Sequence, residues 1–410
     1  MSRRSVEKII VFILFFMIEI SDIYAVVDEE KIHSSNVGVY NLEDMGLIYG
    51  KNIDEKISIA SITKVMTAIV AVENVEDVYD SVKVDYNQIS KWLYKDLSIA
   101  GIYDGQELTY YDLIATMLIP SGADSAIFIA SSIFKNYNEF INKMNEKASE
   151  LGMNSTHFSN PVGYDDENNY STIEDVAIMM NYALENNTLK DILTMKKYTT
   201  SDNKLTVYST LDSLAIKYGV QIDKIIGGKT GTTQNAGRCL ASFSDDEGVP
   251  LLVIVVGSPL YSNMPYNLID TEYLYNIIQK EYSKRYIFVK GDKVFKIPTL
   301  YTTKKYVDIE VPEDVMVYTD KIEQKDIKVQ YEGISLIDSS IKIGEKLGKL
   351  SIKYKGKNIY ESDVFLEENL KFSITKWIKT EYSTVTWMTG IALILISISL
   401  RLDEKKGLAN

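Results

Sequence analysis

The stretch ASITKVMTAIVAV, residues 60–72, combines small and apolar residues with one lysine. Its apolar content predicts a buried helix, and on a helix Ser61 and Lys64 project from one face, about 5 to 6 Å apart at Cβ. Desolvation lowers the pKa of a partly buried lysine, which can then accept the proton of a serine hydroxyl. The alternative is a capping serine beside a solvated lysine, and this spacing taken alone favours that alternative.

A second segment, LIPSGADSA (residues 118–126), places Ser121 in a turn between two predicted helices. There its hydroxyl is positioned to relay a proton or to form a hydrogen bond with Lys64. A helix cap is the commoner role for such a serine.

A third segment, IIGGKTGTTQNAG (residues 225–237), contains several glycines within a predicted strand. Glycine weakens a strand unless something approaches the backbone closely, and a substrate lying along an edge strand does so. Lys229 would supply a positive charge, and Thr230 and Thr232 hydroxyl donors, for an anionic group. The alternative is a structural lysine on an edge strand.

The order of predicted elements through residue 285 indicates an α+β domain. A hairpin at residues 37–49 is followed by a largely helical middle, in which Thr109 and Asp112 mark a helix start. Three strands and a helix then follow over residues 225–282. We expect an antiparallel sheet of about five strands, with helices packed on it and a helical subdomain.

The composition argues against several classes of partner and cofactor. The chain has 57 acidic and 44 basic residues and a net charge of -13, which disfavours a nucleic-acid surface, so no DNA or RNA partner is expected. Two histidines, His33 and His157, are too few for a multi-histidine metal site, and we predict neither metal nor cofactor. The single cysteine, Cys239, lies in a predicted strand and is expected to be a small buried hydrophobe.

Both ends of the chain carry targeting patterns. Residues 1–25 resemble a cleaved secretory signal peptide, with an uncleaved anchor as the alternative. Residues 382–400 are uncharged and of membrane-spanning length, so they predict a transmembrane helix after a linker at residues 371–381 and before a cytoplasmic tail at residues 401–410. We therefore expect a single-pass protein of the cell membrane, with its body at residues 26–285 and beyond on the extracytoplasmic side.

Residues 286–370 differ in texture from the preceding domain. β-branched, charged and aromatic residues alternate there and are interrupted by Gly-Asp, Gly-Glu and Lys-Gly turns. This pattern predicts a small all-β domain.

The three segments together resemble the motifs of the serine penicillin-binding proteins and β-lactamases. The phrases ASITKVMTA, LGMNSTHFSNPVGYDDENNYSTIEDVA and GGKTGTTQNAGRCLASF are similar to those of the low-molecular-mass D-alanyl-D-alanine carboxypeptidases, over about residues 30–285. The β-rich part continues that family's layout. The residues that carry the resemblance are Ser61, Lys64, Ser121, Lys229, Thr230 and Gly231.

The resemblance implies a β-lactamase/transpeptidase-like fold and an acyl-enzyme reaction. Ser61 would attack the carbonyl between two terminal D-alanines of a peptidoglycan stem peptide, Lys64 would accept its proton, and Ser121 would assist proton movement. Water would then release the shortened peptide. β-Lactam antibiotics would act as covalent inhibitors by acylating Ser61.

The resemblance also implies how the substrate is held. Lys229 and Thr230, within the Lys229-Thr230-Gly231 motif, would bind the terminal carboxylate, and the N–H groups of Ser61 and Thr232 would form the oxyanion hole. Arg238 either touches substrate or lines the strand, and the sequence leaves both alternatives open.

Two departures from the family pattern support alternative functions. Ala123 stands where an asparagine is usual, which favours a wall-binding relative with weak turnover. The arginine that many relatives carry after the third strand pair is absent from residues 257–274. A β-lactamase with the same motifs is the other alternative, with Glu167 in a comparable stretch, although its surroundings do not match that class.

Overall fold

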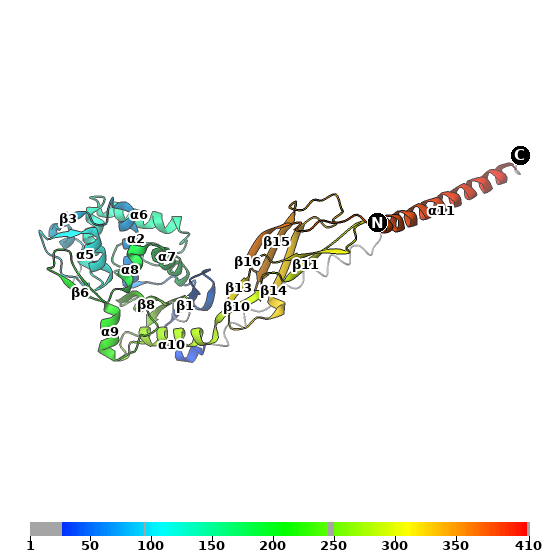
Figure 1. Ribbon diagram of the computed structural model, residues 1–410. Helices are drawn as coiled ribbons and strands as arrows, with labels where there is room; N and C mark the ends of the chain where they lie inside the picture. Colours follow the sequence, from blue (N-terminus) through cyan, green and yellow to red (C-terminus); the bar gives the residue numbers. More distant parts are fainter. Residues whose placement is uncertain (1–26, 94–95, 245–249, 408–410) are drawn as a thin grey trace. The chain divides into compact units, whose positions relative to one another are not determined.

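The computed structural model describes residues 27–93, 96–244 and 250–407. The chain divides into two compact units that meet between Ser283 and Lys284 (Figure 1). The signal peptide predicted over residues 1–25 lies outside the described residues.

An antiparallel five-stranded sheet organises the first unit, which confirms the predicted α+β fold. The strands lie in the order β2-β1-β9-β8-β7. A hairpin, β1–β2, thus joins the three later strands through the pairing of β1 with β9. Strand β7 forms one edge of this sheet, and its outer side is open for another extended chain. The bounds are β1 Asn36–Asn41, β2 Leu47–Lys51, β7 Gly227–Thr233, β8 Gly237–Ser244 and β9 Leu251–Ser258.

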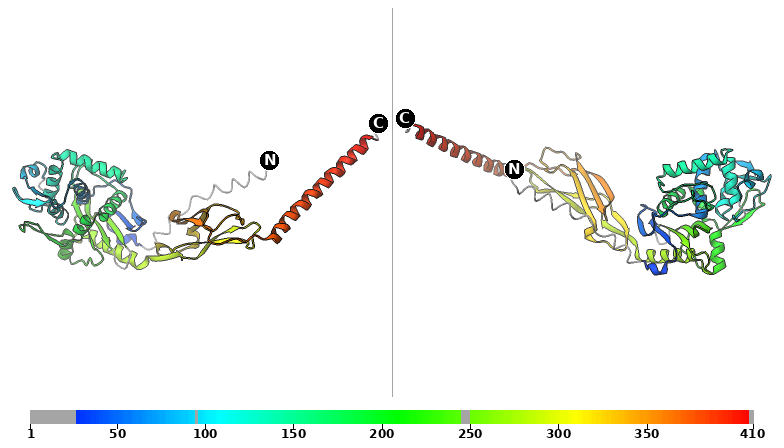
Figure 2. Two further views of the ribbon diagram at one scale, coloured as in Figure 1. Left: turned by 45° about the horizontal axis from the view of Figure 1, so that its top comes forward. Right: turned by 180° about the vertical axis from the view of Figure 1, so that it is seen from behind.

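Helices cover both faces of this sheet. Helix α10 (Tyr266–Glu281) packs on β8 and β9, and α7 (Ile173–Glu185) packs on β1 and β9. Both views of Figure 2 show the helices of residues 64–150 on the side of the sheet away from α10. Because both faces are covered, β9 is buried over nearly its whole length, as its apolar sequence requires.

The helical subdomain is built around α2 (Lys64–Asn74), whose residues are buried from Lys64 through Ala71. Helix α4 (Tyr110–Leu118), α5 (Ala123–Ser132) and α6 (Tyr137–Glu150) pack around α2. A helix enclosed on all sides has to be apolar all round, which residues 64–72 are apart from their lysine and one threonine.

The start of α4 confirms the predicted capping signal. Thr109 accepts the backbone N–H of Asp112, and the Asp112 carboxylate accepts the backbone N–H of Thr109. The same carboxylate also accepts hydrogen bonds from Ser201 and Tyr198. These long-range bonds fix the beginning of α4 and therefore the turn at its end, which contains Ser121.

Several short elements of the first unit were not predicted from the sequence. They have too few residues for a clear hydrophobic period. They are β3 Ser81–Lys83, α3 Tyr86–Ser90, β4 Glu107–Thr109, α8 Asn187–Thr194, β5 Lys197–Thr199, β6 Thr206–Tyr208, α9 Thr210–Tyr218 and the 3₁₀ turn η2 Glu29–Lys31.

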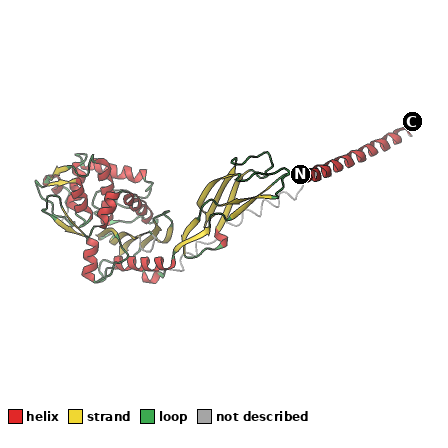
Figure 3. Cartoon of the chain, viewed as in Figure 1, coloured by secondary structure: helices red, strands yellow, loops and turns green. Residues whose placement is uncertain are grey.

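The second unit contains an all-β domain, as predicted, and Figure 3 shows it as strands and loops. Its sheets are β10-β13, β11-β12 and β14-β15-β16, around a core that includes Ile297, Leu350 and Ile352. The bounds are β10 Ser283–Phe288, β11 Lys293–Pro298, β12 Tyr306–Glu310, β13 Val315–Thr319, η5 Gln324–Asp326, β14 Ile327–Gly333, β15 Lys346–Tyr354 and β16 Lys357–Phe365.

The transmembrane helix predicted over residues 382–400 is not supported. Those residues lie inside α11 (Ile374–Gly407), which also takes in part of the predicted linker and tail. Within residues 27–93, 96–244 and 250–407, no helix combines the length and the apolar content needed to cross a membrane.

Candidate active site

Ser61 and Lys64 are brought together at the start of the buried helix. Ser61 lies in a 3₁₀ turn, η3 (Ala60–Thr63), and Lys64 is the first residue of α2, so the regular helix begins three residues later than predicted. The Lys64 Nζ lies 2.8 Å from Ser61 Oγ and donates to the carbonyl oxygen of Val162, also at 2.8 Å. The amine is thus held by one neighbour in sequence and one far along the chain.

Burial makes Lys64 a base. Its side chain is almost fully buried, with 1 % exposed, and this burial holds its pKa well below the ordinary lysine value. The positive charge of Lys229 lowers the pKa further, while the Asp124 carboxylate opposes the shift. When the amine is neutral, the same 2.8 Å contact allows the Ser61 hydroxyl to donate to Nζ.

Ser121 lies in the turn between α4 and α5, as predicted, and is buried. Its φ of 65° is in the left-handed region, which costs a non-glycine residue energy and which is found most often at functional sites. The Lys64 amine bonds to Ser61 and Val162, so among the described residues the predicted Lys64–Ser121 hydrogen bond is not formed.

Ala123, at the position of the missing asparagine, is the first residue of α5 and is fully buried. Its backbone N–H donates to Ser98 O, so this N–H is not free for a substrate. The next residue, Asp124, accepts the backbone N–H groups of Ala100, Gly101 and Ile102. The start of α5 therefore fixes the loop at residues 98–102 rather than presenting a side-chain amide.

Strand β7 carries the predicted anion-binding residues on the sheet edge. Lys229 is 1 % exposed, and its Nζ donates to the carbonyl oxygen of Thr230 at 2.9 Å. Burial lowers the Lys229 pKa to about 7. The Thr230 hydroxyl lies 2.6 Å from that of Thr210 at the start of α9, and the Thr232 hydroxyl donates to Gly231 O.

Two glycines allow the site to close around Ser61. A Cβ on Gly231 would lie 2.9 Å from the Ala60 Cβ and 3.0 Å from the Ser61 backbone nitrogen, so β7 passes directly beside the serine. Gly163, with a φ of 79°, approaches even more closely, because its Cβ would lie 1.8 Å from the Ala60 carbonyl oxygen. Neither position accepts a side chain unless Ala60 and Ser61 move.

The sequence did not identify Val162 and Gly163 as parts of the site. Val162 contributes only its carbonyl, so its side chain gives no chemical signal, whereas the glycine in the phrase NPVGYDD was an available one. Glu167, from the same stretch, is exposed. His157 is exposed, and its Nδ1 lies 2.6 Å from Asn168 O, which fits a structural role in this loop.

Cys239 is fully buried on β8 opposite Gly231, which confirms the predicted packing role. Burial raises the pKa of its thiol to about 12, and the Sγ donates to Ala236 O. A thiol with this pKa is not a nucleophile near neutral pH. Within the described ranges, no cluster of three or more His, Cys, Asp and Glu side chains forms a metal site.

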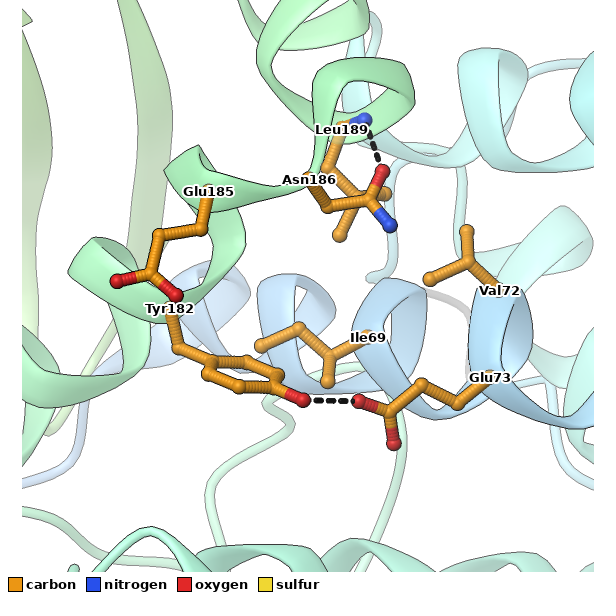
Figure 4. Close-up of a pocket in the computed structure, with 7 residues that line it drawn as sticks. All are labelled: Ile69, Val72, Glu73, Tyr182, Glu185, Asn186 and Leu189. Carbon is orange, nitrogen blue, oxygen red and sulfur yellow. Dashed lines mark hydrogen bonds between the residues drawn. The ribbon is translucent and has the colours of Figure 1, made fainter.

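A separate small pocket lies at the far end of α2 (Figure 4). Tyr182 donates to Glu73 across it at 2.6 Å, and Lys147 pairs with the same carboxylate. Its polar groups thus bond to one another, and the seven motif residues lie elsewhere. The lining consists of Ile69, Val72, Glu73, Tyr182, Glu185, Asn186 and Leu189.

Comparison with known protein families matches two parts of the chain. Residues 25–259 match the D-alanyl-D-alanine carboxypeptidase family, and residues 282–371 match the C-terminal domain of penicillin-binding protein 5.

Individual relatives agree with these matches. The chain is 27% identical over 349 residues to D-alanyl-D-alanine carboxypeptidase DacF of Bacillus subtilis, covering 83% of this chain and 87% of the relative. It is 24% identical to D-alanyl-D-alanine carboxypeptidase DacC of Escherichia coli, covering 78% and 80%.

Solved structures show the same fold. Penicillin-binding protein 5 from Haemophilus influenzae superposes with a TM-score of 0.62 at 22% identity, covering 83% of this chain and 98% of that one. The Streptomyces K15 DD-transpeptidase superposes with a TM-score of 0.53 at 25% identity, covering 60% and 97%.

We predict that Lys229→Met stabilises the protein at pH 7, by on the order of 1–3 kcal/mol, because the buried amine no longer has to be desolvated. Between pH 7 and about pH 9 an unfolded lysine still binds a proton that folded Lys229 has released. The free energy of unfolding of the wild type therefore rises with pH, and the variant should rise less steeply.

Urea unfolding at both pH values measures this difference. The control is Lys190→Met, because Lys190 is exposed on α8. Equal slopes for wild type and Lys229→Met would contradict the prediction. Lys64 titrates in the same direction, so some slope should remain.

We predict that Gly163→Ala stops the acylation of Ser61, because the new Cβ displaces Ala60. The matched control is Gly152→Ala, which has a φ of 80° and nothing within 4 Å of its Cβ. Both variants incur the left-handed backbone cost of about 1–2 kcal/mol, but only one has the collision.

The measurements are urea unfolding and the rate of labelling by a fluorescent penicillin. Gly152→Ala should label at the wild-type rate. If both variants label equally well, the approach of Gly163 to Ala60 is unimportant for the site.

Proposed function

The chain belongs to the D-alanyl-D-alanine carboxypeptidase family, and we propose that Ser61 is the nucleophile of its reaction. The family is one of serine peptidases, so the protein is a hydrolase that removes a terminal D-alanine from peptidoglycan peptides. The observation that carries the assignment to Ser61 is the 2.8 Å contact between its hydroxyl and a lysine amine that is almost fully buried.

In the first half of the reaction, Ser61 Oγ attacks the carbonyl carbon of the bond between the last two D-alanines. The Ser61 proton passes to the neutral Lys64 amine, which Val162 O holds in place. The tetrahedral intermediate then collapses, and the proton is delivered to the leaving nitrogen, so D-alanine departs and an ester on Ser61 remains. Ser121 lies beside this path as the proposed proton relay.

In the second half, Lys64 takes a proton from a water molecule, and the resulting hydroxide attacks the ester carbonyl. The ester bond to Ser61 Oγ breaks, the proton returns to this oxygen, and the shortened peptide leaves. The oxyanion of both steps would be stabilised by the backbone N–H groups of Ser61 and Thr232. The passage of β7 beside the Ser61 nitrogen supports this placement.

The edge of β7 would hold the peptide as an added strand. Lys229 and the hydroxyls of Thr230 and Thr232 lie along this edge, so they would bind the carboxylate of the terminal D-alanine. A carboxylate near Lys229 favours the charged amine and so raises its pKa from the value of about 7 in the free enzyme.

We predict that Ser61→Ala lowers the release of D-alanine from a synthetic pentapeptide by about 10³-fold or more and removes covalent labelling by fluorescent penicillin. The matched control is Ser132→Ala, because Ser132 is a partly buried serine that donates only within α5. It should keep both activities. Labelling that survives Ser61→Ala would show that another residue is the nucleophile.

The lifetime of the penicilloyl enzyme separates this function from that of a β-lactamase. The carboxypeptidase function requires an adduct that persists for minutes or longer. An adduct with a half-life of seconds or less, together with rapid penicillin turnover, would overturn it.

We further propose that the enzyme is exported and works on the outer side of the cytoplasmic membrane, attached through α11. The basic and apolar pattern of residues 1–25 supports export. Attachment is supported by the large apolar side chains that α11 exposes, which would be costly in water. They include Trp387, Met388, Ile391, Leu393, Ile394, Leu395 and Ile396.

Cell fractionation tests the attachment. The full chain should sediment with membranes and resist a high-salt wash, whereas a chain ending at Leu370 should be released. The control is Trp387→Leu, which keeps the apolar character and should still sediment. A full chain that is wholly released would contradict the proposal.

A further inference from the structure

We propose that Arg238 binds the terminal carboxylate of the substrate and so determines the preference for peptides with a free C-terminus. The sequence left Arg238 between substrate contact and a strand-lining role. The inference takes the substrate class from the proposed function and adds a residue that the three motifs do not contain.

The register of the sheet places Arg238 beside the anion-binding edge. Arg238 on β8 lies directly opposite Thr232 on β7. Residues directly opposite in an antiparallel pair share one face and have Cβ atoms about 4.5 to 5.5 Å apart. Thr230, two residues before Thr232, lies on the same face. Arg238 therefore shares this face with both threonine hydroxyls.

The other face of β7 points toward Ser61. Gly231 contacts Ala60, and Lys229 lies two residues before Gly231 on that same face. A carboxylate at the strand edge would thus meet Lys229 from one face and the threonines with Arg238 from the other. A peptide running along the edge is within reach of both faces, because it continues the plane of the sheet.

The guanidinium of Arg238 is held in place but is not neutralised. It donates to three backbone carbonyls of the loop after β9, those of Leu260, Ser262 and Met264. The Tyr218 ring, with its centroid 5.7 Å away, supports it from α9. In the described part of the chain, the guanidinium has no ion pair with a carboxylate.

The donors that remain suit a carboxylate. A guanidinium has five N–H groups, and three are directed at the loop carbonyls, which leaves two, including that on Nε. Hydrogen bonds from arginine to a carboxylate are charge-assisted and stronger than neutral ones. The carbonyls orient the guanidinium in advance, so little side-chain entropy remains to be lost on binding.

The charges of the two cations differ in their dependence on pH. Burial lowers the Lys229 pKa to about 7, so in the free enzyme Lys229 is only partly charged near neutral pH. Arginine stays protonated in proteins. Arg238 therefore supplies a permanent positive charge at an edge where the buried lysine supplies a variable one.

The competing explanation is that Arg238 only positions the loop at residues 260–264. Tyr261 from this loop contacts Gln234 in the β7–β8 turn, so a loosened loop would also disturb the edge. Such a disturbance would affect every substrate. Loss of a carboxylate contact would affect only substrates that carry the carboxylate.

The test compares two peptides, one ending in D-alanyl-D-alanine with a free carboxylate and one with the same end as an amide. Arg238→Gln should lower kcat/KM for the acid about 10- to 100-fold, mainly through KM, and for the amide by less than about 3-fold. Arg238→Lys, which retains the charge, should recover part of the loss. Equal losses for both peptides would overturn the proposal.

Two controls complete the test. Tyr261→Phe removes the loop's contact with Gln234 and keeps the charge, so it should not discriminate between acid and amide. Ser61 acylation by benzylpenicillin and by its methyl ester asks the same question without a peptide. Should the wild type release no D-alanine, the proposed function fails, and the penicillin pair still decides the role of Arg238.

Discussion

The site depends on the exclusion of water from a single amine. Lys64 lies at the start of a helix whose other residues are nearly all apolar, and its Nζ contacts the Ser61 hydroxyl and the carbonyl oxygen of Val162. Burial destabilises the charged amine, which is what turns an ordinary lysine into a base. The packing of α4, α5, α6 and α7 around α2 supplies that burial.

The close approach of separate segments maintains this exclusion of water. Gly163 meets the Ala60 carbonyl and Gly231 meets the Ser61 backbone, so chain segments about 70 to 170 residues apart in sequence enclose the serine. Ala60 and Ser121 both have φ values in the left-handed region, at 47° and 65°. This strain persists because the surrounding contacts over-determine the backbone, and it is one reason why the site has less stability than a purely structural core would have.

Much of the fold could be predicted from residue patterns with a local physical cause. The hairpin, the Thr109–Asp112 capping box and the strands of the sheet follow from periodicity and turn chemistry, and they are present in the structure. The short elements between residues 187 and 218 were missed, because two or three residues carry no period. The transmembrane helix was a prediction from composition, and the described residues do not support it.

For the site, the sequence alone determined which side chains matter, since Ser61 and Lys64 are three positions apart and such a pair is adjacent whether the turn is 3₁₀ or α. Only the tertiary structure decided what surrounds them. The Val162 carbonyl has no side-chain signature, and the position of Arg238 opposite Thr232 depends on strand register. Register is set by the pairing of β7 with β8, and burial by the enclosure of α2, so neither property belongs to any one segment of the sequence.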